Sequence, residues 1–310
     1  MQLLDNHTPN TVFRPNMATI GFFDGVHRGH RFLLSQVLQE ASKRGLASSA
    51  VTFPVHPRKV VQPDFHPQLL TTCSEKVELL GTSGLDYCIM LDFTPTLAAF
   101  SARQFMAMLK ERYNVQALLV GYDHRFGHNR SEGFDDYCRY GRELGVEVLR
   151  AEACSYNDEL VVSSSAIRRF LQSGRVEEAA VCLGYRYSLA GEVVEGYRVG
   201  RTLGFPTANL RMSDPDKLIP AEGVYAVRVL LEGQTYGGML CIGNRPTLDN
   251  GTNVSIEVHI FQFSGNAYHL PMRIEFVAYM RPEQRFDSLD ALVEQLHKDE
   301  QAARQTLAQL

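Results

Sequence analysis

The pattern of apolar residues changes near residue 185, and this change constrains the fold more than any other feature of the chain. Before it, short apolar runs alternate with amphipathic helical segments, which predicts a parallel sheet covered by helices on both faces. After it, strand-like segments follow one another across Gly, Asn and Asp turns, which predicts a β barrel. We therefore expect two domains, residues 1–184 and 185–310, a number that suits a chain of 310 residues.

The periodicity of each half predicts individual elements. In the first half we expect strands at 17–23, 47–53, 87–91 and 115–121, and helices at 28–45, 72–84 and 101–113. In the second half the strand-like segments are 187–196, 223–243, 255–263 and 271–280, with a terminal helix at 288–310 and a short joining helix within 171–186. Ligands of open α/β sheets bind beyond the carboxyl ends of the strands, so we expect the first site there.

Composition narrows the class of protein. The net charge of -4 argues against a dedicated nucleic-acid binder, and there is no run of about 18 apolar residues that would predict a membrane span. The first residues lack a basic region followed by an apolar run, so we expect no secretory signal. Six cysteines without a CxxC pair predict free thiols in a reducing compartment, so we expect a cytoplasmic protein.

The segment GFFDGVHRGH, residues 21–30, follows the first expected strand and opens the first expected helix. A helix N-terminus attracts anions, and Gly21 and Gly25 permit close approach of a ligand to the backbone. His27 and His30 share one face of the first helical turn. The segment predicts a phosphate site other than a Walker A loop, whose GxxxxGK[ST] pattern is absent. A metal site on the two histidines, or an ordinary polar turn, are the alternatives.

A second anion site is predicted by VVSSSAIRRFLQSG, residues 161–174. Ser164 and Ser165 place hydroxyl groups at a helix start, and Arg168 follows one turn later. The alternative is an ordinary serine N-cap beside a surface arginine.

Two segments of the second half carry further candidate chemistry. In GYRVGRTLGFPTANL, the glycines permit close approach, proline fixes its own φ, and hydroxyl and amide oxygens suit Mg²⁺. These residues are Gly200, Gly204, Pro206, Thr207 and Asn209. In SIEVHIFQF, Glu257 and His259 lie on one face of a strand, where a carboxylate can accept a proton from an alcohol. The alternatives are a glycine-rich turn and a solvated strand glutamate.

Four segments of the first half resemble known signatures. GFFDGVHRGH resembles the GxFDxxHxGH signature of the nucleotidyltransferase superfamily, and SSSAIR resembles its SSTxIR signature. LLVGYDHRFGHNR and TFPVHPRKVV resemble the VGxDFxFG and TFxPHPxxV segments of the bacterial bifunctional FAD synthetases, which join riboflavin kinase and FMN adenylyltransferase. The resemblance implies a Rossmann-like nucleotidyltransferase domain in which FMN attacks the α-phosphorus of ATP.

The resemblance also implies which residues form this first site. His27, His30 and Arg168 are implied as catalytic residues that stabilise developing charge. The residues implied to bind ATP and its phosphates are Gly21, Phe22, Asp24, Gly25, His27, His30, Ser164, Ser165 and Arg168. The residues implied to bind the flavin are Phe53, His56, Asp123, Arg125 and Phe126.

The string GRxxGFPTAN resembles the hallmark of flavokinases and implies a riboflavin kinase barrel with a C-terminal helix. ATP is implied to bind at Gly200, Gly204, Pro206 and Thr207, and Mg²⁺ at Thr207 and Asn209. Glu257 is implied as the base that takes the proton of the ribityl 5′-hydroxyl. The segments EGVYAV and IGNRPT match flap and binding-loop elements, with Glu222 and Tyr225 implied to bind the flavin.

Together these resemblances imply a bifunctional enzyme. Riboflavin and ATP would give FMN and ADP in the barrel, and FMN and ATP would give FAD and pyrophosphate in the α/β domain. The expected partners are these small molecules, with Mg²⁺ as cofactor, no nucleic acid and no membrane, and the expected state is a monomer. Departures from the family pattern occur at Val55, His124, Glu195 and Gln262, and the first three motivate one alternative, a single-activity enzyme. A non-catalytic flavin-binding protein is the other.

Overall fold

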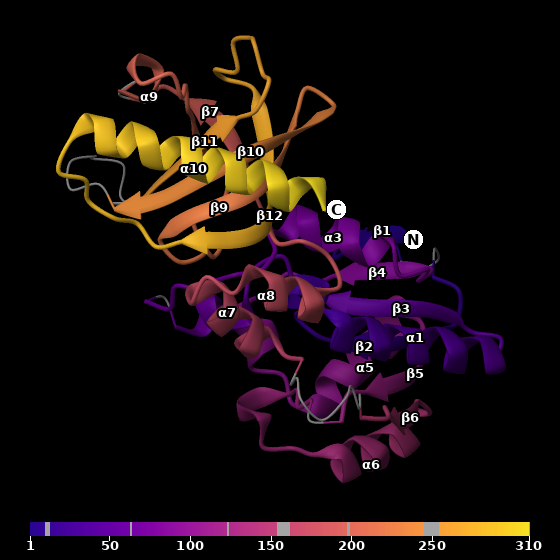
Figure 1. Cartoon of the computed structure of the whole chain (residues 1–310). Helices are drawn as coiled ribbons and strands as arrows, with labels where there is room; N and C mark the ends of the chain where they lie inside the picture. Colours follow the sequence, from indigo (N-terminus) through magenta and orange to yellow (C-terminus); the bar gives the residue numbers. More distant parts are fainter. Residues whose placement is uncertain are drawn as a thin grey trace. The chain divides into compact units, whose positions relative to one another are not determined.

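The computed structural model describes residues 1–9, 13–62, 64–122, 124–153, 162–196, 199–244 and 254–309 (Figure 1). The chain divides into two compact units, Met1–Ser163 and Ser164–Leu310. Residues 164–184, expected in the first domain, are compact with the second unit because their helices contact one another and a barrel strand. The domain limit at residue 184 stays a prediction, and the two units are described separately below.

The first unit contains a six-stranded parallel sheet in the order β1-β4-β3-β2-β5-β6. Its strands are β1 (Gln2–Asp5), β2 (Asn16–Ile20), β3 (Ala47–Thr52), β4 (Tyr87–Met90), β5 (Val115–Val120) and β6 (Glu147–Arg150). Every residue of β2 and β3 is buried. Parallel strands buried on both faces are what the continuous apolar runs predicted, so the expected fold of this unit is confirmed.

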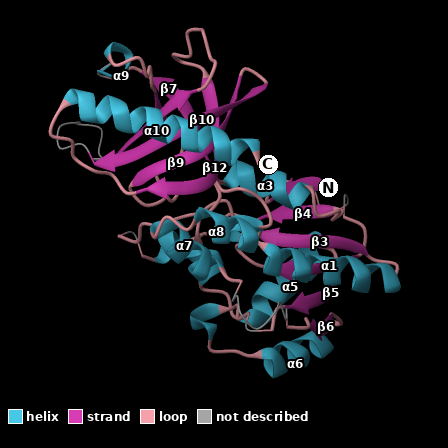
Figure 2. Cartoon of the chain, viewed as in Figure 1, coloured by secondary structure: helices cyan, strands magenta, loops and turns pink. Residues whose placement is uncertain are grey.

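Helices connect the parallel strands (Figure 2). They are α1 (Arg28–Lys43), α2 (Pro57–Val61), α3 (Cys73–Gly81), α4 (Pro95–Ala98), α5 (Ala102–Tyr113) and α6 (Phe134–Leu144), with short 3-10 turns η2 (Asp24–Val26) and η3 (His128–Arg130). Helix α3 begins with a capping box between Thr72 and Glu75, and α5 begins with one between Ser101 and Gln104. The three helices expected here therefore form.

The sequence pattern missed the elements at both edges of the sheet. Strands β1 and β6 have four residues each and expose their terminal residues, so neither carries a clear apolar alternation. The first expected strand also ends three residues early, because the chain turns sharply after Ile20. Edge strands need less apolar surface than central ones, and this weakens their sequence signal.

The second unit is built on a closed antiparallel barrel in the order β10-β11-β8-β7-β12-β9. The strands are β7 (Ser188–Val194), β8 (Ala208–Met212), β9 (Gly223–Leu231), β10 (Gln234–Asn244), β11 (Val254–Ile260) and β12 (Pro271–Arg281). Glu232 and Gly233 both have positive φ, at 50° and 77°, which gives the tight turn that joins β9 to β10. The expected barrel is confirmed.

The described residues of the second unit form the helices α7 (Ser164–Gln172), α8 (Val176–Leu183), α9 (Val199–Thr202) and α10 (Leu289–Ala308). Helix α10 begins at the Ser288 cap and contacts β9, β10 and β12 (Figure 1). Ala303 of α10 packs in one apolar cluster with Phe205, Met239 and Phe261. Across the described ranges, no helix has both the length and the apolar character needed to cross a bilayer.

Candidate active sites

The turn that follows β2 is strained. Phe23, Gly25 and Val26 have positive φ values of 55°, 79° and 35°. Positive φ is costly for a β-branched residue such as valine, and it persists only where surrounding contacts hold it. Gly21 is required for packing, since a Cβ there would lie 2.8 Å from the Phe23 ring. The backbone leaves the carboxyl end of the sheet in a conformation that needs external support.

Asp24 provides that support. Its side chain is buried, and its carboxylate accepts hydrogen bonds from the backbone N–H groups of Leu70 (2.9 Å) and Thr71 (3.1 Å). The Thr71 hydroxyl in turn accepts a hydrogen bond from the N–H of Gly25 at 3.0 Å. Asp24 therefore fastens the strained turn to the segment before α3. Its expected contact with ATP stays a prediction, as do those of Gly21, Phe22 and Gly25.

His27 caps helix α1. Its Nδ1 accepts the N–H of His30 at 3.3 Å, so a neutral His27 carries its proton on Nε2. The two imidazole rings stack, with centroids 3.7 Å apart and an interplanar angle of 16°. His30 Nδ1 is buried and finds no hydrogen-bond partner among the described residues. Such an orphaned nitrogen is uncommon in folded proteins and fits a site that a polar ligand completes.

Burial favours the neutral form of His30 and of His124. Loss of solvent lowers the pKa of His30 well below its ordinary value, and the neighbouring His27 and His124 lower it further. Burial also lowers the pKa of His124 to about 4, with a contribution from Arg130. Because His124 acts electrostatically on His30, the 118–130 segment reaches the histidine pair. A phosphate would favour the protonated rings and raise these pKa values.

Aromatic side chains gather beside this turn. Phe22 meets His56 edge-on at a centroid distance of 4.7 Å, and Phe53 meets Phe93 edge-on at 5.3 Å. His56 also caps α2 through its Nδ1. The structure therefore brings Phe53 and His56, both expected on the flavin side, to the carboxyl ends of β2 and β3.

The other expected flavin residues lie in the 118–130 segment. Phe126 is buried in the core of the first unit, stacked on Tyr137 with centroids 4.1 Å apart, and Arg125 is exposed. Asp123 lies outside the described residues. The contacts of these three residues with a flavin stay predictions.

Ser164, Ser165 and Arg168 lie on α7, in the second compact unit. Ser164 and Arg168 are partly buried, whereas Ser165 is exposed. Their contribution to the histidine site stays a prediction.

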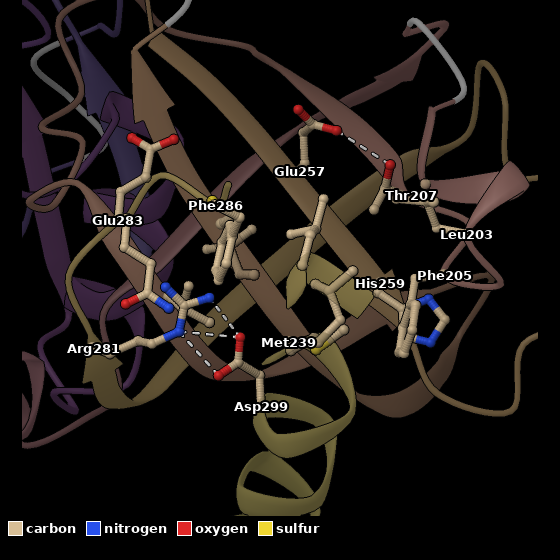
Figure 3. Close-up of a pocket in the computed structure, with 17 residues that line it drawn as sticks. Leu203, Phe205, Thr207, Met239, Glu257, His259, Arg281, Glu283, Phe286 and Asp299 are labelled. Carbon is tan, nitrogen blue, oxygen red and sulfur yellow. Dashed lines mark hydrogen bonds and ion pairs between the residues drawn. The ribbon is translucent and has the colours of Figure 1, made fainter. Parts of the chain in front are cut away.

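The barrel holds a pocket of about 380 Å³ (Figure 3). Its polar lining residues are Thr207, Glu257, His259, Arg281, Glu283, Gln284 and Asp299. Its apolar lining residues include Leu203, Phe205, Val224, Met239, Leu240, Phe286, Leu292 and Leu296. In Figure 3, Thr207 and Glu257 face each other on one side of the pocket, away from Arg281 and Asp299.

Strand register brings the candidate kinase residues together. Antiparallel pairing of β11 with β8 places Glu257 opposite Asn209. The Thr207 hydroxyl, one residue before β8, donates a hydrogen bond to Glu257 Oε2 at 3.2 Å. His259, two residues along β11, donates from Nδ1 to the carbonyl of Pro206 at 2.8 Å. A carboxylate and a hydroxyl therefore meet at one end of the pocket.

Glycines make room for this arrangement. The N–H of Phe205 donates to the carbonyl of Gly200 at 2.8 Å, and a Cβ on Gly200 would lie 2.3 Å from the Phe205 carbonyl oxygen. Gly204 has a φ of 84°, which favours glycine. A Cβ on Gly196 would lie 2.3 Å from the amide nitrogen of Asn209. The loop 200–205 closes tightly beside Thr207 for these reasons.

Two expected flavin residues lie elsewhere in the barrel. Tyr225 is fully buried, packs edge-on against Phe276 and Tyr279, and donates its hydroxyl hydrogen to the carbonyl of Ala221. Burial raises the pKa of its hydroxyl well above the ordinary value. Glu222 is exposed, and neither residue is among those that line the pocket. Their contacts with riboflavin stay predictions.

Sequence reasoning missed a buried ion pair at the other side of the pocket. Arg281 Nη2 lies 2.6 Å from Asp299 Oδ2, and Arg281 Nε also donates to that carboxylate. Gln295 donates to Asp299 Oδ1 at 2.8 Å. A single aspartate in the middle of an amphipathic helix does not predict burial by itself; only its place on the face that carries Gln295 and Ala303 could have indicated it.

The donor set suits a hard cation bound together with phosphates. Within the described ranges, no group of three or more His, Cys, Asp or Glu side chains could hold a metal. The Thr207 hydroxyl does contact the Glu257 carboxylate, and Asn209 lies opposite Glu257 in the strand register. Mg²⁺ commonly uses one or two protein oxygens and completes its shell with phosphate and water, so these residues fit it.

Comparison with known proteins finds a matching family model for each half of the chain. The family model described as FAD synthetase matches residues 10–166, and that described as riboflavin kinase matches residues 183–307. A crystal structure described as a macrolide-efflux protein from Streptococcus pneumoniae superposes with a TM-score of 0.86 at 29% identity, over 97% of this chain and 98% of that one. The name macrolide-efflux protein is that of the Streptococcus pneumoniae protein, and we do not apply it to this chain.

Curated relatives match along almost their whole length. A bifunctional riboflavin kinase/FMN adenylyltransferase of Listeria monocytogenes is 35% identical over 95% of this chain and 93% of the relative. One from Escherichia coli is 36% identical over 93% of this chain and 92% of the relative. Two matched domains in the same order, with identity spread along the chain, place the chain in the family of bifunctional riboflavin kinase/FMN adenylyltransferases.

Proposed function

We propose that the barrel pocket is the riboflavin kinase site of this bifunctional enzyme and that Glu257 is its general base. The observation that supports this most is the contact between Thr207 and Glu257 at the polar side of a largely apolar pocket. Glu257 takes the proton of the ribityl 5′-hydroxyl. The freed oxygen forms a bond to the γ-phosphorus of ATP, and the bond from that phosphorus to ADP breaks.

The pocket matches the two-part chemistry of riboflavin. The apolar wall, with Met239, Phe286 and Leu296, suits the flat ring system, and the polar side suits the ribityl hydroxyls. Gly200 and Gly204 permit the triphosphate to approach the backbone beside Pro206 and Thr207.

Thr207 and Asn209 would hold Mg²⁺, which supplies charge neutralisation at the phosphates when bound. Glu257 has a separate task in this scheme, since its carboxylate must reach the substrate hydroxyl. The hydrogen bond from Thr207 orients that carboxylate in the ligand-free chain.

We propose that FMN adenylylation takes place at the carboxyl end of the parallel sheet. His27, His30 and the backbone of Gly21, Phe22 and Gly25 bind ATP phosphates, and Ser164, Ser165 and Arg168 complete that site. Phe53, His56, Asp123, Arg125 and Phe126 bind the flavin side. The FMN phosphate is already an anion, so the residues need to position it and to stabilise developing charge rather than to remove a proton.

We also propose the domain limits, the oligomeric state and the location of the chain. We propose domain limits at residues 1–184 and 185–310, a monomer, and a cytoplasmic location, where ATP and riboflavin are both at hand. Riboflavin, FMN and ATP are the partners in this proposal.

One time course tests the proposal. Protein stripped of flavin is mixed with riboflavin, ATP and Mg²⁺, and the products are separated by chromatography. FMN should appear first and FAD later, because the second reaction consumes the product of the first. FMN without FAD would contradict the adenylyltransferase assignment, and unchanged riboflavin would contradict the kinase assignment.

A further inference from the structure

Lys76 on α3 is a buried cation at the edge where the first unit binds its ligands. Only 2% of its surface is exposed. Its Nζ donates a hydrogen bond to the carbonyl of Phe53 at 2.6 Å and lies 4.0 Å from the centroid of the Phe22 ring. Phe22 follows β2 and Phe53 follows β3, so one ammonium joins the ends of two neighbouring strands.

The two strand ends are also linked directly. The Thr52 hydroxyl donates a hydrogen bond to the carbonyl of Phe22 at 3.1 Å. Phe22 contacts His56, and the strained turn with His27 begins just beyond it. The ammonium therefore supports the backbone and ring positions from which both the phosphate-binding turn and the flavin side extend.

The surroundings of Lys76 are unusual for a buried charge, which normally has an ionised partner. In the described part of the chain, its ammonium is held by a carbonyl and an aromatic face and forms no ion pair with a carboxylate. The titratable groups that face it are Cys73 on α3, Cys88 on β4 and Asp24 on the turn. The Asp24 carboxylate is already engaged by the backbone of residues 70–71.

We propose that Lys76 is a positioning residue for FMN adenylylation, whose protonated ammonium fixes Phe22 and Phe53 at the ligand-binding edge. This inference rests on the proposed placement of ATP and FMN at that edge. A neutral amine has no cation to attract the Phe22 ring and is a weaker donor to the Phe53 carbonyl. Activity should therefore depend on the charge of Lys76.

The pKa of Lys76 determines how adenylylation should change with pH. Burial lowers the pKa of Lys76 to about 8, with smaller opposing effects of Cys73, Asp24 and Cys88. Adenylylation should be supported below that pH and should weaken above it. Stability should change in the opposite direction, since the unfolded chain keeps this proton up to about pH 10.4, so this group favours folding more as pH rises above 8. A purely structural lysine would not produce the loss of activity.

The test compares Lys76→Met with the matched Lys43→Met, an exposed lysine of α1. For each protein, kcat/KM for FMN adenylylation is measured from pH 6.5 to 9.5, beside riboflavin phosphorylation by the same chain. Lys76→Met should lower adenylylation at pH 7 by at least tenfold and remove the fall above pH 8. Lys43→Met and all kinase rates should follow the wild type.

Other outcomes distinguish the role of Lys76 from the placement of the ATP and FMN site. If Lys76→Met keeps the wild-type rate and pH profile while His27→Ala abolishes FAD formation, the role of Lys76 is refuted and the site stands. If both variants keep full activity, the placement of the site is refuted as well. If Lys76→Met fails to fold, the wild-type profile decides alone: a value of kcat/KM that stays level from pH 7 to 9.5 overturns the inference.

Discussion

The proposed kinase site is assembled within one closed barrel, whereas the proposed site of the first unit is assembled from segments that follow separate parallel strands. In the barrel, pairing of β8 with β11 sets Glu257 opposite Asn209 and beside Thr207. In the sheet, a strained turn after β2 must be fastened by Asp24 to residues 70 and 71. Register positions the first set of groups, and long-range side-chain contacts position the second.

The two regions also differ in the titratable groups that they contain. The barrel pocket contains the Glu257 carboxylate, which is the proposed proton acceptor. The proposed site of the first unit contains stacked imidazoles and a buried ammonium, and its proposed reacting groups are anions. The difference teaches that a site for proton removal and a site for charge stabilisation can be told apart from their titratable groups.

The largest expected effect lies in the barrel. Glu257→Gln removes the base while keeping size and hydrogen bonding, so FMN formation should fall by about 10²–10⁴-fold. FMN adenylylation by the same variant should be unchanged. Both rates are measured by chromatography of products, with Glu283→Gln, another carboxylate of the pocket, as the matched control. A wild-type rate of FMN formation would remove Glu257 from its role.

The next effect is on stability. Asp299→Ala leaves the partly exposed Arg281 side chain (18% exposed) without its partner. Loss of one member of a fully buried pair costs about 3–5 kcal/mol, and the exposure of Arg281 lowers that cost. We therefore expect the urea midpoint for loss of kinase activity to fall markedly. Asp290→Ala, an exposed aspartate on the same helix, is the control and should change little. Equal midpoints for the two variants would mean that the pair contributes nothing to the barrel.

In the first unit, His27→Ala combined with His30→Ala should lower FAD formation from FMN by about 10²–10³-fold or more, as expected when preorganised donors are lost. Riboflavin phosphorylation should continue. The exposed His7→Ala serves as control. FAD formation at the wild-type rate would be incompatible with a phosphate site at the histidine pair.

Much of the fold could be predicted from apolar periodicity, because alternation of strand and helix and runs of short strands leave different patterns. The edge strands β1 and β6 were missed, since strands of four residues bury too few side chains to show a period. The end of β2 was placed too late. Positive φ is rare for phenylalanine and valine, so the residue types at Phe23 and Val26 do not predict this turn.

The motifs predicted the candidate residues, but they did not predict the contacts that hold those residues in place. Asp24 lies 46 and 47 residues from the backbone groups that it binds. The contact of Lys76 with Phe53 spans 23 residues, and Lys76 stands in an ordinary amphipathic helical pattern. Such contacts depend on the tertiary packing of loops, which a pattern of residue types along one chain does not contain.

The smallest expected effect concerns Arg168, whose helix and proposed site belong to different compact units. It lies on α7, which is compact with the barrel, yet the proposal gives it to the adenylylation site. A charge-assisted hydrogen bond contributes about 1.5–3 kcal/mol, so Arg168→Ala should weaken use of ATP in FAD formation by roughly 10–150-fold. The exposed neighbour Arg169→Ala is the control. Loss of riboflavin phosphorylation instead would assign Arg168 to the kinase half and redraw the comparison between the two sites.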